Sequence, residues 1–278
     1  MTGRVAGKVA FITGAARGQG RSHAVRLAEE GADIIAVDLC GDLRNAAYPG
    51  GTEAELAETV ALVEKTGQRI VASKADVRNL DELRAAVDAG VEELGRLDIV
   101  VANAGVLTAV GPFADMDEAD WSYVLDVNLS GAWRTAKVAL PHLRATGGHP
   151  SIVMIASSAG LRASRNTSHY VASKSGLIGL TRALALELGP EHIRVNSISP
   201  TQVDTPMIQN EFMYRRARPD LDHPGRDDLA EASLSRMAMP IAWIDPAEVS
   251  NAVLFLASDE SRYVTGLAMT VDAGISIA

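Results

Sequence analysis

The architecture is set by residues 8–20, which read Lys8-Val9-Ala10-Phe11-Ile12-Thr13-Gly14-Ala15-Ala16-Arg17-Gly18-Gln19-Gly20. Residues 8–12 are apolar enough for a buried strand, the glycines follow at once, and residues 21–30 have the pattern of a helix. Glycines in this context permit a tight turn and the close approach of a pyrophosphate, which the free N–H groups of the helix N-terminus attract. The motif predicts a dinucleotide-binding turn, although a glycine-rich loop without a ligand is the alternative for the motif alone.

A second buried strand, residues 33–38, ends in the carboxylate of Asp38. An acid at this place can accept hydrogen bonds from both hydroxyls of an adenosine ribose. Arg17 favours the 2′-phosphate of NADP, whereas Asp38 repels it. Two unit charges about 4 Å apart interact by roughly 1 kcal/mol in water and about 4 kcal/mol at an effective dielectric of 20. Because Leu39 offers no compensating cation, the sequence predicts NAD as the cofactor.

The rest of the chain alternates apolar runs with helical stretches, as expected for one α/β domain over residues 1–278. Further strands are expected at residues 69–75, 97–102, 151–156, 193–198 and 267–271, and helices at residues 52–65, 81–93, 121–143, 170–188 and 247–257. Right-handed crossovers predict a Rossmann-like, doubly wound parallel sheet of seven strands in the order 3-2-1-4-5-6-7, with the ligand cleft at the carboxyl ends of the strands.

Two segments interrupt this alternation. Residues 39–51 form a long connection where the adenosine would lie, and they could cover it or be a decorative surface loop. Residues 206–245 combine methionines and aromatic residues with a charged middle, which favours a lid over a substrate. Within this lid, Arg215, Arg216 and Arg218 are expected to be solvated residues near acids.

Composition limits the kinds of partner. The net charge is −9 and no long basic run is present, which argues against nucleic acid. The single cysteine, Cys40, excludes an internal disulfide framework, and the scattered histidines lack metal-ligand spacing. No apolar signal region or membrane-spanning run is found. We therefore expect a cytoplasmic protein without a metal or a membrane segment.

The pair Tyr170 and Lys174, which follows Ser157 by thirteen and seventeen residues, has the spacing of neighbours on one helix face. A phenol titrates near pH 10 and is a poor base at neutral pH. A neighbouring cation favours the phenolate and is expected to lower the pKa of Tyr170 toward the working range. Taken alone, the pair would be weak evidence for a catalytic site, because most Tyr-x-x-x-Lys pairs are solvated pairs on a helix.

Together these residues resemble the short-chain dehydrogenase/reductase family over almost the whole chain. The resemblance rests on ordered motifs, namely Thr13-Gly14-x-x-x-Gly18-x-Gly20, Asp76-Val77, Asn103-Ala104-Gly105, Asn128, Ser157, Tyr170-x-x-x-Lys174, Asn196-x-x-x-Pro200 and Val271-Asp272-Ala273-Gly274. Taken alone, Asp76 could instead cap the helix that starts near Leu80, and Asn103 could simply close a strand end.

The resemblance implies a role for each matching residue. Tyr170 would be the acid/base, Lys174 would hold the nicotinamide ribose and depress the pKa of the tyrosine, and Ser157, with Ser158 as its rival, would bind the substrate oxygen. Asn128 would position a water in a proton relay. The cofactor-binding residues implied are Gly14, Arg17, Gly18, Gln19, Gly20, Asp38, Leu39, Asp76, Val77, Asn103, Ala104, Gly105, Tyr170, Lys174, Pro200, Val203 and Thr205.

Within the family, residues 14–23, the long connection after Asp38 and residues 199–207 resemble the mycofactocin-coupled, carveol-dehydrogenase-like group. This implies oxidation of a hydrophobic secondary alcohol, such as a cyclic terpenoid, by tightly held NAD with mycofactocin as electron acceptor. The alternatives are an ordinary short-chain dehydrogenase or ketoreductase with exchanging NAD, and a non-catalytic NAD-binding redox sensor. Family analogy also implies a homotetramer. Apolar residues suggested for the substrate pocket are Leu107, Val110, Leu161 and Trp243, although each could be ordinary core.

Overall fold

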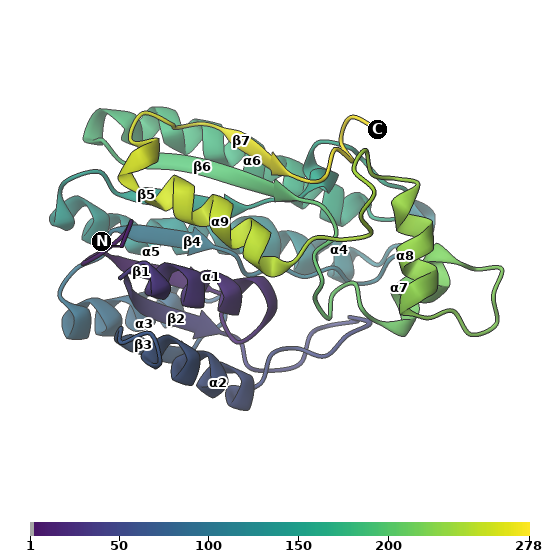
Figure 1. Ribbon diagram of the computed structural model, residues 1–278, viewed down its shortest axis with the longest axis horizontal. Coiled ribbons are helices and arrows are strands. Elements are labelled where there is room, and N and C mark those ends of the chain that lie inside the picture. The colour runs from purple at the N-terminus through teal and green to yellow at the C-terminus, as the bar shows by residue number, and fades with distance from the viewer. Residues whose placement is uncertain (1–2) are drawn as a thin grey trace.

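A computed structural model describes residues 3–278 and shows a single parallel sheet of seven strands (Figure 1). The strands are β1 (Val9–Thr13), β2 (Asp33–Asp38), β3 (Ile70–Lys74), β4 (Ile99–Ala102), β5 (Ser151–Ile155), β6 (Arg194–Pro200) and β7 (Ala268–Val271). Their order is β3-β2-β1-β4-β5-β6-β7, and every neighbouring pair is parallel. The predicted fold and strand order are confirmed, with strand ends shifted by one or two residues.

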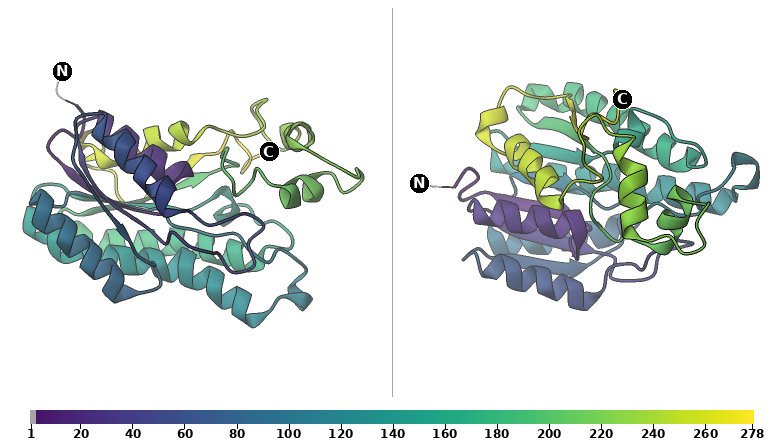
Figure 2. Two further views of the ribbon diagram at one scale, coloured as in Figure 1. Left: turned by 90° about the horizontal axis from the view of Figure 1, so that it is seen from below. Right: turned by 45° about the vertical axis from the view of Figure 1, so that its right-hand side comes forward.

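Helices cover both faces of the sheet (Figure 2). They are α1 (Gly18–Glu29), α2 (Glu53–Glu64), α3 (Leu80–Leu94), α4 (Glu118–Leu125), α5 (Gly131–Thr146), α6 (Ser168–Leu188), α7 (Glu211–Ala217), α8 (Arg226–Leu234) and α9 (Pro246–Ala257). Side chains of α1, α2 and α9 share one buried apolar cluster with the sheet, and those of α3, α5 and α6 share another. The central strands are buried on both faces, as their continuous apolar runs require.

The prediction of one helix over residues 121–143 is wrong in one respect. The segment contains two helices, α4 and α5, separated by a π-helical turn, Asp126–Ser130. Asn128 lies in this turn, is fully buried and makes a paired set of hydrogen bonds with the backbone of Val106. A π turn inserts an extra residue into the helical ladder, and such turns are frequent at functional sites. The π turn therefore coincides with the residue whose side chain bonds to the backbone of Val106, outside its own helix.

The two irregular segments differ in structure. Residues 39–51 contain no helix or strand, whereas residues 206–245 contain α7 and α8, which lie together beyond the carboxyl edge of the sheet (Figure 1). Within residues 3–278, no helix has both the length and the apolar character to cross a membrane. The same residues contain no cluster of three histidine, cysteine or acidic side chains placed to hold a metal ion.

Helix α1 packs against α9 around the fully buried His23. Its Nδ1 lies 2.8 Å from the hydroxyl of Ser250, while its Nε2 has no hydrogen-bond partner among residues 3–278. Burial lowers the pKa of His23 from 6.5 to about 3, because no neighbour compensates a charged imidazole. Between pH 3 and 6.5, His23 is therefore neutral in the folded protein but charged in the unfolded chain.

We predict that His23 contributes to acid unfolding. Between pH 6.5 and about 3 the unfolded chain binds a proton that the folded chain excludes, so stability is present above pH 6.5 and is lost as the pH falls. The contribution is at most about 5 kcal/mol. Urea unfolding at several pH values should show a shallower acid dependence for His23→Gln. The control His223→Gln, at an exposed position, should keep the wild-type slope. Equal slopes for the wild type and His23→Gln would contradict the assignment.

Candidate active site

The β1–α1 turn has a backbone geometry that only glycine allows. Gly14 has a φ of +70°, and a Cβ on Gly20 would lie 2.0 Å from the carbonyl oxygen of Gly14. Asn103, at the end of β4, fixes this turn by donating from Nδ2 to the carbonyls of Thr13 (2.9 Å) and Gly14 (3.2 Å). Asn103 therefore does more than close a strand, which was the alternative for this residue.

The first turn of α1 is open to a ligand. No side chain caps the helix and no acidic residue lies in its first turn. The backbone N–H groups there and the positive end of the helix dipole form an anion site. They face a cleft whose empty space, with the open space at its mouth included, is about 970 Å³.

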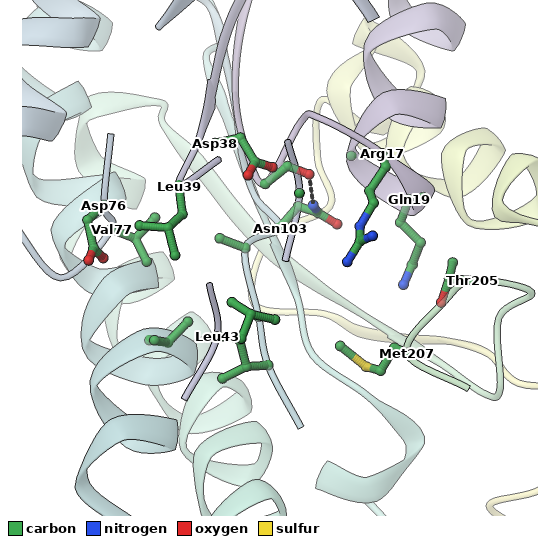
Figure 3. Close-up of a pocket in the computed structure, with 18 of the residues that line it drawn as sticks. Arg17, Gln19, Asp38, Leu39, Leu43, Asp76, Val77, Asn103, Thr205 and Met207 are labelled. Carbon is green, nitrogen blue, oxygen red and sulfur yellow. Dashed lines mark hydrogen bonds between the residues drawn. The ribbon is translucent and has the colours of Figure 1, made fainter. Parts of the chain in front are cut away.

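Most of the predicted cofactor residues line this cleft (Figure 3). Asp38, Leu39, Asp76 and Val77 gather at one end, and Thr205 and Met207 lie at the other, beyond Arg17 and Gln19. The predicted residues found in its lining are Gly14, Arg17, Gly18, Gln19, Gly20, Asp38, Leu39, Asp76, Val77, Asn103, Ala104, Gly105 and Thr205. Four predicted cofactor residues, Tyr170, Lys174, Pro200 and Val203, lie outside the lining. The lining residues that sequence reasoning missed are Leu43, Tyr48, Gly51, Ala75, Arg78, Val106, Tyr123, Val127, Pro206 and Met207.

Asp38 is oriented by backbone donors. Its two carboxylate oxygens accept from the N–H groups of Ala16 and Cys40, each at 3.0 Å. Gly51 packs so closely that a Cβ there would lie 2.8 Å from Asp38 Oδ1. The carboxylate is therefore fixed at the end of β2, with its remaining lone pairs available to a ligand.

The two cations that line the cleft are both engaged by protein groups. Arg17 donates to the carbonyl of Pro49 and lies 3.7 Å from Glu55. Arg78 forms a bidentate pair with Asp76 and stacks on the ring of Tyr123. Neither is free to pair with a 2′-phosphate, which removes the one feature that favoured NADP. The helix near Leu80 is capped by Asn79, so the capping alternative for Asp76 is wrong.

The predicted catalytic residues meet where α6 crosses the end of β5. Lys174 is buried, its Nζ donates to the carbonyl of Ile155 at 2.8 Å, and it lies 5.7 Å from the centre of the Tyr170 ring. Ser157, and not Ser158, interacts with the Tyr170 phenol. Asn128 approaches from the π turn, and its Nδ2 also donates to Ser173 at 3.1 Å. A Cβ on Gly105 would be 3.4 Å from both Asn128 Oδ1 and Lys174 Nζ, so Gly105 leaves space between them.

The sequence predicts a lowered pKa for Tyr170, whereas its surroundings in the structure raise it. Burial raises the pKa of Tyr170 above 10.0, and the interaction with Ser157 only partly offsets it. Burial also lowers the pKa of Lys174, from 10.5 to about 8. Desolvation disfavours the charged form of both groups.

Residues 39–51 are tied to the rest of the site. Arg44 and Asn45 donate to the buried carboxylate of Asp120 on α4, at 2.7 and 2.9 Å. The buried Tyr48 accepts from the N–H of Leu107 at 3.1 Å. Such contacts hold residues 39–51 beside the cleft, which favours a cover over the cleft rather than a decorative surface loop. An aromatic residue within the polar, glycine- and proline-containing residues 39–51 is the sequence signal from which the role of Tyr48 could have been inferred.

A second cavity, with an empty space of about 730 Å³, lies next to the cleft, and Tyr48 and Met207 line both. Its walls come from residues 45–48, residues 107–110 and the start of residues 206–245. Leu107 and Val110 line it as predicted. Leu161 and Trp243 lie outside this lining, because Leu161 is exposed and Trp243 packs 4.6 Å beneath the guanidinium of Arg226.

Comparisons with known proteins agree with this geometry. Residues 14–276 match the family model described as enoyl-(acyl carrier protein) reductase. The chain is 52% identical to (-)-trans-carveol dehydrogenase of Rhodococcus erythropolis, with 99% of each chain covered. The structure of carveol dehydrogenase from Mycobacterium avium in complex with NAD has a TM-score of 0.99 and 55% identity, and covers 100% of both chains. A short chain dehydrogenase from Mycobacterium paratuberculosis bound to NAD has a TM-score of 0.90 and 43% identity, over 99% of this chain and 100% of that one.

We predict that buried Lys174 makes stability rise with pH in the alkaline range. Between pH 8 and 10.5 the unfolded chain keeps a proton that the folded lysine has lost, so the stability contribution is present above 10.5 and is lost as the pH falls toward 8. Relative to Lys174→Met, wild-type stability should increase across this window by up to roughly 3 kcal/mol. The control Lys65→Met, at an exposed lysine, should run parallel to the wild type in urea unfolding. A parallel course for Lys174→Met would refute the assignment.

Proposed function

We propose that this chain, which belongs to the short-chain dehydrogenase/reductase family, oxidises a hydrophobic secondary alcohol to the ketone with NAD, or catalyses the reverse reaction. One observation carries the proposal: at the carboxyl end of β5, Tyr170 has both a side-chain hydrogen bond with Ser157 and the buried Nζ of Lys174 within 5.7 Å of its ring centre. The carveol dehydrogenases among its relatives support an apolar alcohol as substrate.

The residues of the cleft fit NAD. The open first turn of α1 would bind the pyrophosphate, and the fixed carboxylate of Asp38 would accept from the adenosine ribose. Because Arg17 and Arg78 are already paired, a 2′-phosphate would find repulsion and no cation. When bound, NAD supplies the ring carbon that accepts the hydride from the carbinol carbon.

The chain's own residues supply the proton chemistry. Tyr170 takes the proton of the substrate hydroxyl, and Ser157 donates a hydrogen bond to the same oxygen and so stabilises charge that develops there. The ammonium of Lys174 stabilises the phenolate, which burial otherwise disfavours. A water held near Asn128 and Lys174 would carry the released proton toward solvent. Positioning by Ser157 fixes the hydroxyl for reaction.

We further propose that NAD is held without exchange and that mycofactocin accepts the electrons. In this proposal residues 39–51 form a strap over the adenosine half of the cleft, pinned to α4 through Asp120. The bond from Arg17 to Pro49 closes the other end of the strap against α1. The ordinary family member with freely exchanging NAD is the alternative, since the same catalytic residues serve both.

The subunits are proposed to assemble as a homotetramer through α5 and α6. Trp133 on α5 is 42% exposed and Leu186 on α6 is 81% exposed, so both helices present apolar side chains to solvent. Exposed apolar side chains that gather on long helices favour a protein–protein contact.

The acid/base role of Tyr170 is tested by Tyr170→Phe. Removal of the hydroxyl should lower kcat by about 10²- to 10⁴-fold. NAD binding and thermal stability should be unchanged, because Tyr170 does not line the cofactor cleft. Steady-state assays on a panel of secondary alcohols with an artificial electron acceptor give kcat, and calorimetry gives NAD affinity. Tyr263→Phe, at an exposed tyrosine, is the control. Retained turnover in Tyr170→Phe would disprove the role.

Retention of NAD is tested by incubating the purified protein with isotopically labelled NAD, desalting it, and identifying the released nucleotide by mass. Near-stoichiometric unlabelled NAD is expected in the wild type. Asp120→Ala removes the acceptor of Arg44 and Asn45 and should permit exchange. Asp115→Ala, at an exposed residue of the same region, should retain unlabelled NAD. Labelled NAD or an empty site in the wild type would instead favour an ordinary exchanging dehydrogenase.

A further inference from the structure

The first turn of α6, which carries Tyr170, lacks the side-chain cap that commonly stabilises the start of a helix. Thr167 is the N-cap residue, but its hydroxyl shares a hydrogen bond of 2.7 Å with the hydroxyl of Ser164 instead of capping the helix. Tyr170 is the third residue of α6, within the turn whose N–H groups find no acceptor in the helix itself. Because an uncapped turn is less stable than a capped one, the position of Tyr170 depends on contacts with other segments.

His169, the residue before Tyr170, supplies such a contact. Its side chain is fully buried, and its Nε2 lies 2.6 Å from the backbone carbonyl oxygen of Thr108, which is also buried. Because a carbonyl oxygen can only accept, Nε2 carries the proton and donates the hydrogen bond. Nδ1 has no hydrogen-bond partner among residues 3–278, so the bond to Thr108 is the only one that this side chain makes with them.

The acceptor, Thr108, lies in a segment that is itself held in place. The N–H of Leu107 donates to the hydroxyl of Tyr48 at 3.1 Å, and the N–H of Ala109 donates to the carbonyl of Asn45 at 3.2 Å. Ala109 has a φ of +45°, a left-handed conformation that a residue with a Cβ keeps only where its surroundings impose it. Both neighbours of Thr108 are thus bonded to the connection after β2, so its carbonyl is a fixed point to which α6 is attached.

A second bond joins the same two segments, but it acts outside the helix. The N–H of Gly111 donates to the carbonyl of Asn166 at 3.0 Å, and Asn166 precedes the first residue of α6 by two positions. This bond holds the loop that leads into α6, whereas the bond of His169 holds the first turn itself. The imidazole is therefore the group that fixes the turn of Tyr170 against Thr108.

We propose that His169 is a positioning residue for the proposed reaction: its bond to Thr108 sets where the phenol of Tyr170 lies relative to the substrate oxygen. The inference rests on the proposed function and adds a residue that acts through Tyr170, since His169 lines neither the cleft nor the second cavity. Proton transfer requires the two oxygens within hydrogen-bond reach. A displacement of about 1 Å can lower a rate by about 10²-fold.

The test compares two substitutions of similar size that differ in the donor. His169→Gln keeps an N–H donor at about the reach of Nε2, whereas His169→Met fills similar space without one. With a secondary alcohol, His169→Met should lower kcat by about 10- to 100-fold at nearly unchanged KM, because the proton acceptor is displaced while the binding surface stays. His169→Gln should keep kcat close to the wild-type value. Ser168→Ala, in the same turn, is the matched control and should keep wild-type kcat, because its hydroxyl contacts a weak acceptor, the sulfur of Met116, at 3.7 Å.

Amide hydrogen exchange of residues 166–172 separates this inference from the proposed function, because it needs no turnover. Exchange should be faster in His169→Met than in the wild type and in His169→Gln, with equal NAD content in all three proteins. The same exchange pattern in a protein that oxidises no alcohol would support the hold of His169 on this turn and refute the dehydrogenase. Equal exchange and equal kcat in His169→Met and the wild type would overturn the inference and leave the dehydrogenase standing.

Two further results would show that His169 has a merely structural role. One is a lower melting temperature of His169→Met with wild-type kcat at a temperature where the variant is folded. The other is an equal loss of kcat in His169→Met and His169→Gln, since that result reports the shape of the imidazole and not its N–H donor. If His169→Met does not fold, His169→Asn takes its place with the same expected results, because its amide is too short to reach Thr108.

Discussion

Two backbone segments that touch at the β1–α1 turn determine where everything else in the site can lie. With a Cβ on Gly20 the turn could not form, because that atom would lie 2.0 Å from the carbonyl oxygen of Gly14. Asn103 then joins this turn to the end of β4 through its amide. The start of α1 is thereby fixed over the carboxyl edge of the sheet, where the free N–H groups of the helix and the side chains at the ends of β2, β4 and β5 converge.

Charge is arranged differently at the two ends of this edge. Near β2 each charged group already has a partner: Arg17 and Arg78 have oxygen acceptors, and Asp38 has two backbone donors. Near β5 the buried Lys174 has only a carbonyl oxygen as acceptor, and burial disfavours its charge. An ammonium without a carboxylate is stabilised by a negative charge beside it, which in the proposed function is the phenolate of Tyr170 before it takes the substrate proton. The buried lysine thus lies where its charge would stabilise the phenolate form of Tyr170.

The fold and most of the cleft follow from local pattern. The pattern of residues 8–30 specifies a strand, a turn and a helix. Because parallel strands bring their carboxyl ends to one edge, the sequence also predicts that Asp38, Asn103 and Ser157 lie at the same edge of the sheet. Three features could not be foreseen. The π turn at Asn128 depends on hydrogen bonds with Val106, which lies far from it in the chain. The pKa of Tyr170 depends on burial that spacing does not report. The contacts of residues 39–51 depend on Asp120 and Leu107, which approach only in three dimensions.

Tyr48 gives the molecule a property that neither cavity has alone. Its side chain lines both the cleft and the second cavity, and its hydroxyl accepts from the backbone of Leu107, which lines the second cavity. A ligand in one cavity that favours one position of this ring changes the affinity of the other cavity. Linkage requires the effect to be reciprocal, so each ligand changes the affinity of the other by the same factor. Any such effect would pass through the ring of Tyr48, which is a wall that the two cavities share.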